Sequence, residues 1–197
     1  AAPGWGRTSP FERAAALERI ARAIEARSDE LARALTIDQG KPLQAEAYGE
    51  VEELILYFRM AGAEATRIEG MLPPSVDPAK RVLVYRVPKG VVGVITPWNW
   101  PYTMPAELIG PALAAGNAVI WNPARFTSWC SVTLADAILE ADLPPGVFNL
   151  VPGPGGEGGV IVERAEVAGS AAGRCPEEAG LPPVGRPQVV HRPDPGC

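Results

Sequence analysis

Between residues 91 and 151 the chain alternates short apolar runs with longer segments of helical period, and this alternation limits the folds open to it. Residues 91–95 form a continuous apolar run, which is typical of a strand buried on both faces. Helices are expected at about residues 104–115 and 128–141, and further strands at 118–121 and 147–151. Strand, helix, strand, helix and strand joined by short links require right-handed crossovers and a parallel sheet. We therefore predict an α/β fold.

Two long helices are expected ahead of this sheet. Ser9-Pro10-Phe11-Glu12 matches a capping box with Pro at the first helical position. The apolar residues that follow recur at helical spacing, and the charged residues between them are expected to face water; the first group is Leu17, Ile20, Ile24, Leu31 and Leu35, and the second is Arg13, Arg19, Arg22 and Glu25. Ser28-Asp29 offers the start of a separate helix, and Gly40 offers a left-handed cap before Pro42.

The second long helix is expected at about residues 43–67. Its apolar stripe is Ala47, Val51, Leu54, Ile55, Phe58 and Ala61, and Glu46, Glu50 and Glu53 are expected to face water. Residues 70–80 carry three prolines and are expected to form an irregular connector, followed by a strand at residues 81–86. The predicted fold class is thus an incomplete doubly wound (Rossmann-like) parallel sheet preceded by two long helices.

Composition excludes several classes of function. The chain has 18 basic and 23 acidic side chains and a net charge of −5, which repels phosphate backbones, so no nucleic-acid partner is expected. Residues 91–106, the longest uncharged stretch, contain three prolines and cannot be a lipid-exposed helix, so no membrane span is expected. Three scattered cysteines and a start without Met or signal pattern favour a reducing, cytoplasmic setting and a chain that begins inside a larger protein.

One turn carries the clearest functional signal. Residues 95–101 read Ile-Thr-Pro-Trp-Asn-Trp-Pro and follow the buried strand at its carboxyl end, where ligands collect in open parallel sheets. Two prolines fix the turn, Trp98 and Trp100 offer flat apolar walls, and the Asn99 amide could donate to a developing negative oxygen. The alternative is a rigid turn in which Asn99 only caps the next helix.

A second motif is a glycine cluster after the last predicted strand. Residues 153–158 fit Gly-x-Gly-x-x-Gly, whose backbone amides can approach a pyrophosphate. Pro154 lacks an N–H, however, and the motif follows the third strand of the unit rather than the first. An ordinary glycine turn is therefore the simpler interpretation.

Several segments together resemble the cofactor-domain core of the aldehyde dehydrogenase superfamily. They are residues 97–101, residues 110–117 (Gly-Pro-Ala-Leu-Ala-Ala-Gly-Asn) and residues 143–153 (Leu-Pro-Pro-Gly-Val-Phe-Asn-Leu-Val-Pro-Gly). Residues 40–43 and the two upstream helices are similar to the amino-terminal region of that family. The resemblance covers about residues 5–163. It implies NAD(P)-dependent oxidation of an aldehyde to a carboxylic acid, and a homo-oligomer in the full-length form.

The resemblance also assigns roles to single residues. Asn99 matches the amide that donates to the oxyanion of the thiohemiacetal formed when a cysteine attacks the aldehyde. Backbone along the turn is implied to line the nicotinamide riboside, Gly153 to lie near the adenosine end, and Gly169-Ser170 to lie beside the cofactor. The implied cofactor-binding residues are Ile95, Thr96, Pro97, Trp98, Asn122, Arg125, Gly153, Gly169 and Ser170.

Two departures from the family pattern qualify this picture. Where the family has Lys-Pro-Ala-Glu to hold the adenine ribose, this chain has Asn122-Pro123-Ala124-Arg125. The Asn122 amide can still bond a ribose hydroxyl and Arg125 could favour a 2′-phosphate, so both NAD and NADP are open; a solvated charge is the simpler alternative for Arg125. The general-base Glu-Leu-Gly-Gly segment and the nucleophilic cysteine of the family are not found, and Cys130 is expected to be a buried hydrophobe.

The expected organisation is a helical region and connector (1–80), a partial NAD(P)-binding βαβαβ domain (81–170) and a Pro- and Gly-rich tail (171–197) without folded structure, with the catalytic domain absent. The mixture of family-like and foreign fragments in the tail would follow from a frameshift or small deletions near residues 164–175. We therefore expect an inactive fragment. Two alternatives are a non-catalytic module that binds nucleotide or another subunit, and a chain that is not stable on its own.

Overall fold

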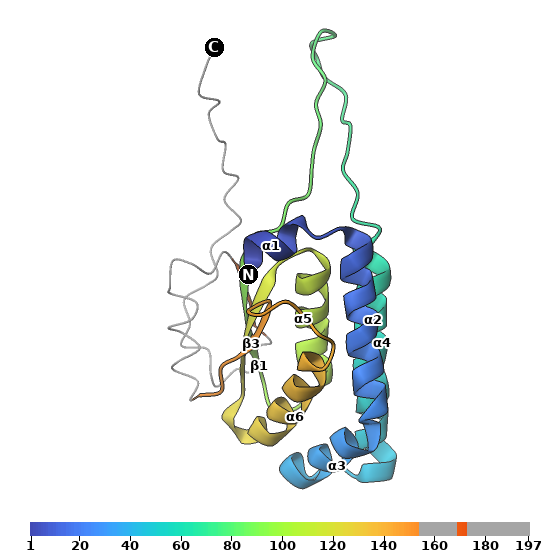
Figure 1. Ribbon diagram of the computed structural model, residues 1–197, viewed down its shortest axis with the longest axis vertical. Coiled ribbons are helices and arrows are strands. Elements are labelled where there is room, and N and C mark those ends of the chain that lie inside the picture. The colour runs from blue at the N-terminus through green and yellow to red at the C-terminus, as the bar shows by residue number, and fades with distance from the viewer. Residues whose placement is uncertain (154–168, 173–197) are drawn as a thin grey trace.

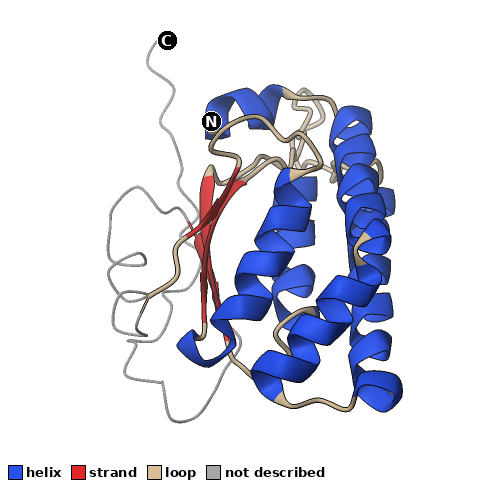
Figure 2. Cartoon of the chain, turned by 60° about the horizontal axis from the view of Figure 1, so that its bottom comes forward, coloured by secondary structure: helices blue, strands red, loops and turns tan. Residues whose placement is uncertain are grey.

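The computed structural model describes residues 1–153 and 169–172, which form a helical layer packed on one face of a four-stranded sheet (Figures 1 and 2). The strands are β1 (Val91–Thr96), β2 (Ala118–Pro123), β3 (Phe148–Leu150) and β4 (Gly169–Ala172). Their order is β3-β2-β1-β4, and every neighbouring pair is parallel. The predicted α/β class with a parallel, Rossmann-like sheet is confirmed.

Two helices make the crossovers. Helix α5 (Thr103–Ala114) connects β1 to β2, and the short η2 (Arg125–Thr127) with α6 (Ser128–Leu139) connects β2 to β3. Strand β4, which we did not expect from the sequence, pairs with the edge of β1 that β2 leaves open. The order of the sheet therefore reverses beside β1. The carboxyl end of β1 is a topological switch point, where doubly wound folds bind ligands.

The helices before the sheet are α1 (Ala2–Arg7), α2 (Pro10–Ala26), α3 (Ser28–Gln39), the π-helical η1 (Leu43–Ala47) and α4 (Tyr48–Ala65). The capping box of α2 is present: Glu12 N donates to Ser9 Oγ at 3.2 Å and Ser9 N donates to Glu12 Oε2 at 3.0 Å. Helix α3 ends at Gly40 with φ 83°, a left-handed conformation that glycine adopts at little cost. Helix α1 was not expected; its Trp5 is buried, and the indole N–H donates to Leu113 O at 3.0 Å.

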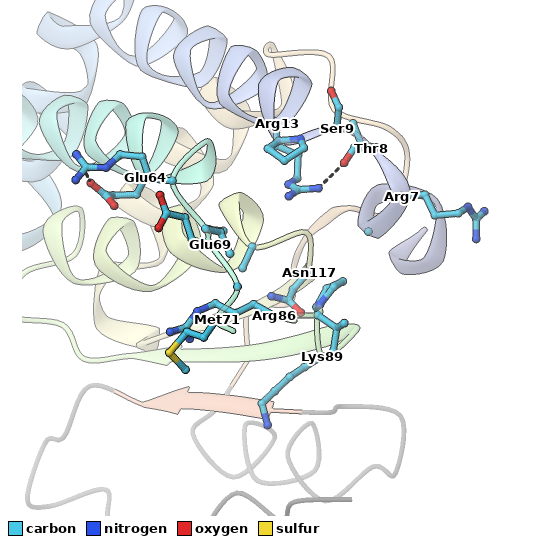
Figure 3. Close-up of a pocket in the computed structure, with 18 residues that line it drawn as sticks. Arg7, Thr8, Ser9, Arg13, Glu64, Glu69, Met71, Arg86, Lys89 and Asn117 are labelled. Atoms are coloured by element: carbon cyan, nitrogen blue, oxygen red, sulfur yellow. Dashed lines mark hydrogen bonds and ion pairs between the residues drawn. The ribbon is translucent and has the colours of Figure 1, made fainter. Parts of the chain in front are cut away.

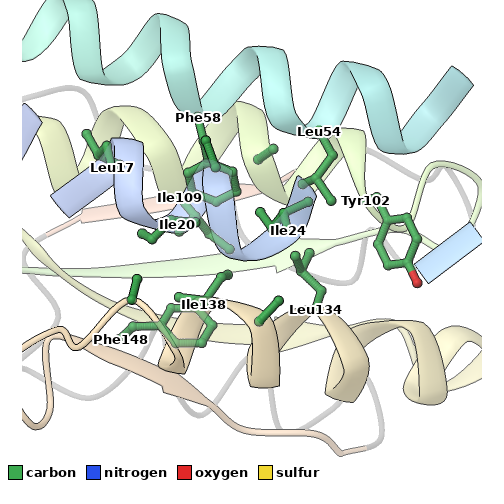
Figure 4. Close-up of a cluster of buried hydrophobic side chains, with 14 of the residues drawn as sticks. Leu17, Ile20, Ile24, Leu54, Phe58, Tyr102, Ile109, Leu134, Ile138 and Phe148 are labelled. Carbon is green, nitrogen blue, oxygen red and sulfur yellow. The ribbon is translucent and has the colours of Figure 1, made fainter. Parts of the chain in front are cut away.

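The core lies between the helical layer and the sheet, and Figure 4 shows side chains from α2, α4, α5 and α6 meeting there. The apolar stripes predicted for the upstream helices all point into it. Fully buried members include Leu17, Ile20, Ile24, Leu54, Phe58, Ile109, Leu134 and Trp121. Since each buried large side chain contributes roughly 1.5–3 kcal/mol, this one cluster ties the helices to the sheet.

Two charged residues expected in water are buried. Arg13 is 8% exposed: its Nε donates to Ala114 O at 2.8 Å and its guanidinium also donates to Thr8 O, so it satisfies one carbonyl at the end of α5 and one just after α1. Glu50 is 1% exposed. Both predictions were wrong because helical period identifies a face, whereas these side chains find partners on other elements.

The segment between α4 and β1 projects from the body as an arm (residues 68–88; Figure 1). The strand predicted at residues 81–86 is wrong: within the described residues, Val84 forms only an isolated bridge with Met71, at N–O distances of 2.9 and 3.0 Å. A Cβ on Gly70 would lie 2.5 Å from Val84 O, so the two limbs approach closely only because residue 70 is glycine. Among residues 1–153 and 169–172, no helix is both long and apolar enough to cross a membrane.

Candidate functional site

The predicted site residues converge in part at the carboxyl edge of the sheet. Strand register places Ile95 beside Asn122 and Thr96 beside Pro123. Beyond the strands, the turn at residues 97–101 leaves β1, Arg125 follows β2, and Gly153 follows β3. Because the strands are parallel, all three segments emerge at the same edge. The structure thus brings together segments that are up to 58 residues apart in sequence, from Ile95 to Gly153.

The start of the turn is buried and its tip is exposed. Thr96 is 2% exposed, and its Oγ1 accepts a 2.9 Å hydrogen bond from the buried Trp121 indole. Trp98 is 45% exposed, and Asn99 beside it is also exposed. Asn99 does not cap the next helix, because the N-cap of α5 is Tyr102 and that helix end has no side-chain cap of its own. The Asn99 amide is therefore open to a ligand.

Three residues that the sequence analysis did not assign to the site contact this turn and the start of α5: Gln39, Lys41 and Glu50. Gln39 Nε2 donates to Trp98 O at 2.9 Å and to Asn99 O at 3.0 Å. Glu50 Oε1 accepts from Tyr102 N at 2.9 Å and from Thr103 N at 3.3 Å, while Glu50 Oε2 pairs with Lys41 Nζ at 2.5 Å.

Lys41 makes a second contact there, because its Nζ also lies 3.7 Å from the centre of the Trp100 ring. Of these three residues, only Lys41 lies in a segment that the sequence analysis singled out, the family-like residues 40–43.

The two crossover helices begin at this edge, and both N-termini already hold a carboxylate. The carboxylate of Glu50, a residue of α4, accepts from Tyr102 N at the start of α5. Asp38 Oδ2 accepts from Cys130 N in the first turn of α6 at 3.0 Å. Neither helix has an acidic residue in its own first turn. Because a helix N-terminus attracts one anion and here it is satisfied internally, these two termini are not open phosphate sites.

The predicted site residues at the end of β2 and just after it have different environments. Asn122 is 1% exposed, and its Nδ2 donates to Val151 O at 2.8 Å, which ties β2 to the segment after β3. Arg125 is exposed, with its guanidinium 4.5 Å from the centre of the Phe126 ring. Asn122 therefore has a supporting contact within the fold, whereas Arg125 can meet a solvent-borne anion.

Gly169 and Ser170 do not reach the carboxyl edge. They pair with Val92 and Gly93 of β1, four and three residues before Thr96, which is roughly 10–13 Å along a strand. The remainder of the glycine motif, residues 154–158, lies outside the described residues. So do Cys175, His191 and Cys197, which belong to the tail expected at residues 171–197; the first two residues of that tail, Ala171 and Ala172, lie in β4.

Cys130 is the cysteine within the described residues, and its environment does not suit a nucleophile. It is fully buried on α6, as expected from the sequence. Burial, with the Asp38 carboxylate nearby, raises the pKa of the Cys130 thiol to about 12. Since the thiolate is the reactive form, Cys130 is inert at neutral pH.

A separate cavity lies at the opposite end of the sheet (Figure 3). It measures about 980 Å³ and is bordered by Arg13, by Lys89 just before β1 and by Asn117 just before β2. None of the predicted site residues lines it. Its size therefore does not make it the candidate site, which remains at the carboxyl edge.

The parallel strand order and its switch point place this chain in the class of Rossmann-like, doubly wound α/β folds. The family comparison is more specific. The chain belongs to the aldehyde dehydrogenase family, whose model matches residues 1–170.

Individual relatives agree with this assignment. The chain is 42% identical to a glutarate-semialdehyde dehydrogenase of Pseudomonas aeruginosa over 81% of its own length and 33% of the relative. It is 39% identical to the NADP(+) succinate-semialdehyde dehydrogenase of Escherichia coli over 76% of this chain and 32% of that one. The crystal structure of an NAD-dependent aldehyde dehydrogenase from Sinorhizobium meliloti superposes with a TM-score of 0.81 at 37% identity, covering 85% of this chain and 34% of the other. The chain thus spans about a third of the length of the relatives it matches.

Proposed function

We propose that this chain is the amino-terminal and cofactor-domain part of an NAD(P)-dependent aldehyde dehydrogenase, which oxidises an aldehyde to a carboxylic acid. The observation that carries the proposal is the exposed Asn99 amide, on a turn fixed at the carboxyl end of β1. Family membership supplies the reaction class, and the position of the turn supplies the role of the residue.

Asn99 acts on the aldehyde oxygen. When a thiolate adds to the carbonyl carbon, the carbon–oxygen π electrons move to oxygen, and the Asn99 Nδ2–H donates to the resulting oxyanion. A donor held in place before the reaction stabilises that charge without reorganising. The family resemblance puts the attacking cysteine and the general-base glutamate beyond the matched residues. Cys130 cannot substitute for that cysteine because it is buried, with its thiol pKa raised to about 12.

The nicotinamide cofactor supplies the hydride acceptor when it is bound. In our proposal the backbone of residues 95–98 lines the nicotinamide riboside, and Gly153 lies towards the adenosine end. We also propose that Gly169 and Ser170 lie beside the cofactor, as the family pattern implies, although both are residues of β4. Asn122 contributes by holding the end of β3 through Val151 O, in addition to any contact with ribose.

Cofactor preference depends on Arg125. An exposed guanidinium after β2 suits the 2′-phosphate of NADP, and among the relatives one is named for NADP(+) and another is NAD-dependent. We therefore propose that the chain accepts both cofactors and that Arg125 adds affinity for NADP.

We also propose a cytoplasmic setting for the chain. The small number of cysteines and the free, buried thiol of Cys130 support it.

Cofactor titration and turnover test the proposal together. We expect NAD and NADP to change the tryptophan fluorescence of the purified chain. We expect Arg125→Ala to weaken NADP binding about tenfold, which corresponds to about 1.4 kcal/mol, and to leave NAD binding unchanged. Arg22→Ala, at an exposed position on α2, is the matched control. We also expect no reduced cofactor to form with any aldehyde. No response to either cofactor at millimolar concentration, or turnover by the chain alone, would contradict the proposal.

A second candidate function is subunit association, and the arm favours it. Large apolar side chains along residues 68–88 are exposed: Leu72 by 77%, Val76 by 105%, Tyr85 by 72% and Val87 by 78%. Exposed large apolar side chains concentrated on one segment favour a role of that segment in interaction. We propose that the arm joins copies of the chain into a homo-oligomer, whether or not cofactor is bound.

A further inference from the structure

The orientation of the Gln39 amide is fixed by its surroundings. Its Nε2 faces the carbonyl oxygens of Trp98 and Asn99, at 2.9 and 3.0 Å. With the amide reversed, Oε1 would lie against both carbonyls and repel them, because an amide oxygen only accepts. In the observed orientation Oε1 is buried and, within the described residues, has no hydrogen-bond partner. The chain therefore leaves one buried acceptor unsatisfied and keeps both contacts to the turn.

Glu50 fixes the other end of the same turn. Its carboxylate accepts from Tyr102 N and Thr103 N, the first amides of α5, and it is almost completely buried. Lys41 neutralises this carboxylate at 2.5 Å and covers the Trp100 ring. Five of the six residues 98–103, all except residue 101, are thus contacted by side chains from α3, α4 and the segment between them.

We propose that Gln39, Lys41 and Glu50 are positioning residues that set the direction of the Asn99 amide before substrate binds. This inference rests on the proposed role of Asn99 in the dehydrogenase reaction. Gln39 Nε2 donates to the carbonyl before Asn99, that of Trp98, and to the carbonyl of Asn99 itself. One donor therefore anchors the backbone on both sides of the Asn99 Cα atom. With the backbone anchored, only the two side-chain torsions of Asn99 remain to be fixed, and an oxyanion donor is more effective the fewer torsions must be ordered when the charge develops.

The experiment compares two glutamine substitutions in the 197-residue chain. Gln39→Glu keeps the shape of the side chain and removes its N–H donors. Gln44→Glu makes the same chemical change at an exposed position five residues away and is the matched control. The readout is a ¹⁵N–¹H spectrum, in which the five tryptophan indoles and the Asn99 side-chain amide report separately.

We expect Gln39→Glu to shift the Asn99 amide signals and the indole signals of Trp98 and Trp100, while the buried indoles of Trp5 and Trp121 stay in place. Because Gln39→Glu loses two hydrogen bonds and places a carboxylate oxygen against two carbonyls, we expect its melting temperature to lie below that of Gln44→Glu; the selective shift of the Asn99 signals, which a general loss of stability would not produce, is the evidence for positioning. Gln39→Met, an uncharged variant of similar length, should give the same shifts, and it replaces Gln39→Glu if that chain fails to fold. Unchanged Asn99 signals in a folded Gln39 variant would overturn the inference.

The spectra are recorded without cofactor, so this result is independent of the proposed function. A chain that shows the shifts but never responds to NAD or NADP would support the positioning role of Gln39 and contradict the cofactor proposal. A chain that binds cofactor with unchanged Asn99 signals in Gln39→Glu would do the reverse.

Discussion

Glu50 is 1% exposed, and its carboxylate lies between the Lys41 ammonium group and the backbone amides of Tyr102 and Thr103. Glu50→Ala would leave Lys41 in a largely buried site without its counter-charge and would leave two amides without an acceptor. We expect it to lower the free energy of unfolding by about 3–5 kcal/mol, the range seen when one partner of a buried pair is removed. Urea denaturation measures this. Glu52→Ala, exposed on the same helix, should change stability by less than about 0.5 kcal/mol; equal effects of the two substitutions would contradict the buried pair.

Cys130 gives the stability of the chain a defined pH dependence. Burial raises the pKa of its thiol from 9.0 to about 12, so the folded chain keeps this proton at pH values where the unfolded chain loses it. The contribution is fully present below about pH 9 and is lost as the pH rises towards 12, with a slope of up to about 1.4 kcal/mol per pH unit. Urea midpoints between about pH 8 and pH 10 should fall more steeply in the parent chain than in Cys130→Ala. Parallel slopes would show that the thiol titrates normally.

Among the elements, α2 begins with a cap that is entirely local. Ser9 and Glu12 satisfy each other's backbone amides within four residues. Ser9→Ala removes the side-chain acceptor for Glu12 N and should cost about 1 kcal/mol in urea denaturation. Ser9→Asp keeps an acceptor at the same position, so we expect it to retain most of the lost stability. If Ser9→Asp were as unstable as Ser9→Ala, the cap would not be the source of the effect.

The contrast between α2 and the crossover helices shows which elements the sequence can predict. The cap of α2 lies within one turn, so its pattern could be recognised directly. The caps of α5 and α6 come from Glu50 and Asp38, 52 and 92 residues before the amides that they accept from. No local pattern carries that information.

The strands differ in the same way. Strand β1 was predictable because it is apolar throughout. Residues 81–86 have a strand-like composition, yet in the described part of the chain their only bridging partner is Met71 on the other limb of the arm. Strand β4, Gly-Ser-Ala-Ala, carries no strand signal, and its pairing with β1 places it in the sheet.

For the molecule as a whole, the position of the candidate turn in the fold could be predicted from the sequence, but the contacts that support the turn could not. The Asn99 turn follows from one buried strand and the general rule for parallel sheets. The Gln39 contacts cross 59 and 60 residues to Trp98 and Asn99, and they exist only because the helical layer folds back over the carboxyl edge. Family patterns give the position of a reactive group, whereas the tertiary structure shows what restrains it.

The exposed arm predicts how the whole chain behaves in solution. Apolar side chains gain about 25 cal/mol for each Å² removed from water, so an arm exposing Leu72, Val76 and Val87 favours association with a second copy. We expect the sedimentation coefficient of the chain to rise with concentration, and the double substitution Leu72→Asp with Val87→Asp to abolish this rise without changing the melting temperature. Leu56→Asp with Leu139→Asp is the matched control, because these leucines are 53% and 59% exposed on α4 and α6. If the control pair abolished association as well, or if the parent chain were monomeric throughout, the arm would not be the contact surface.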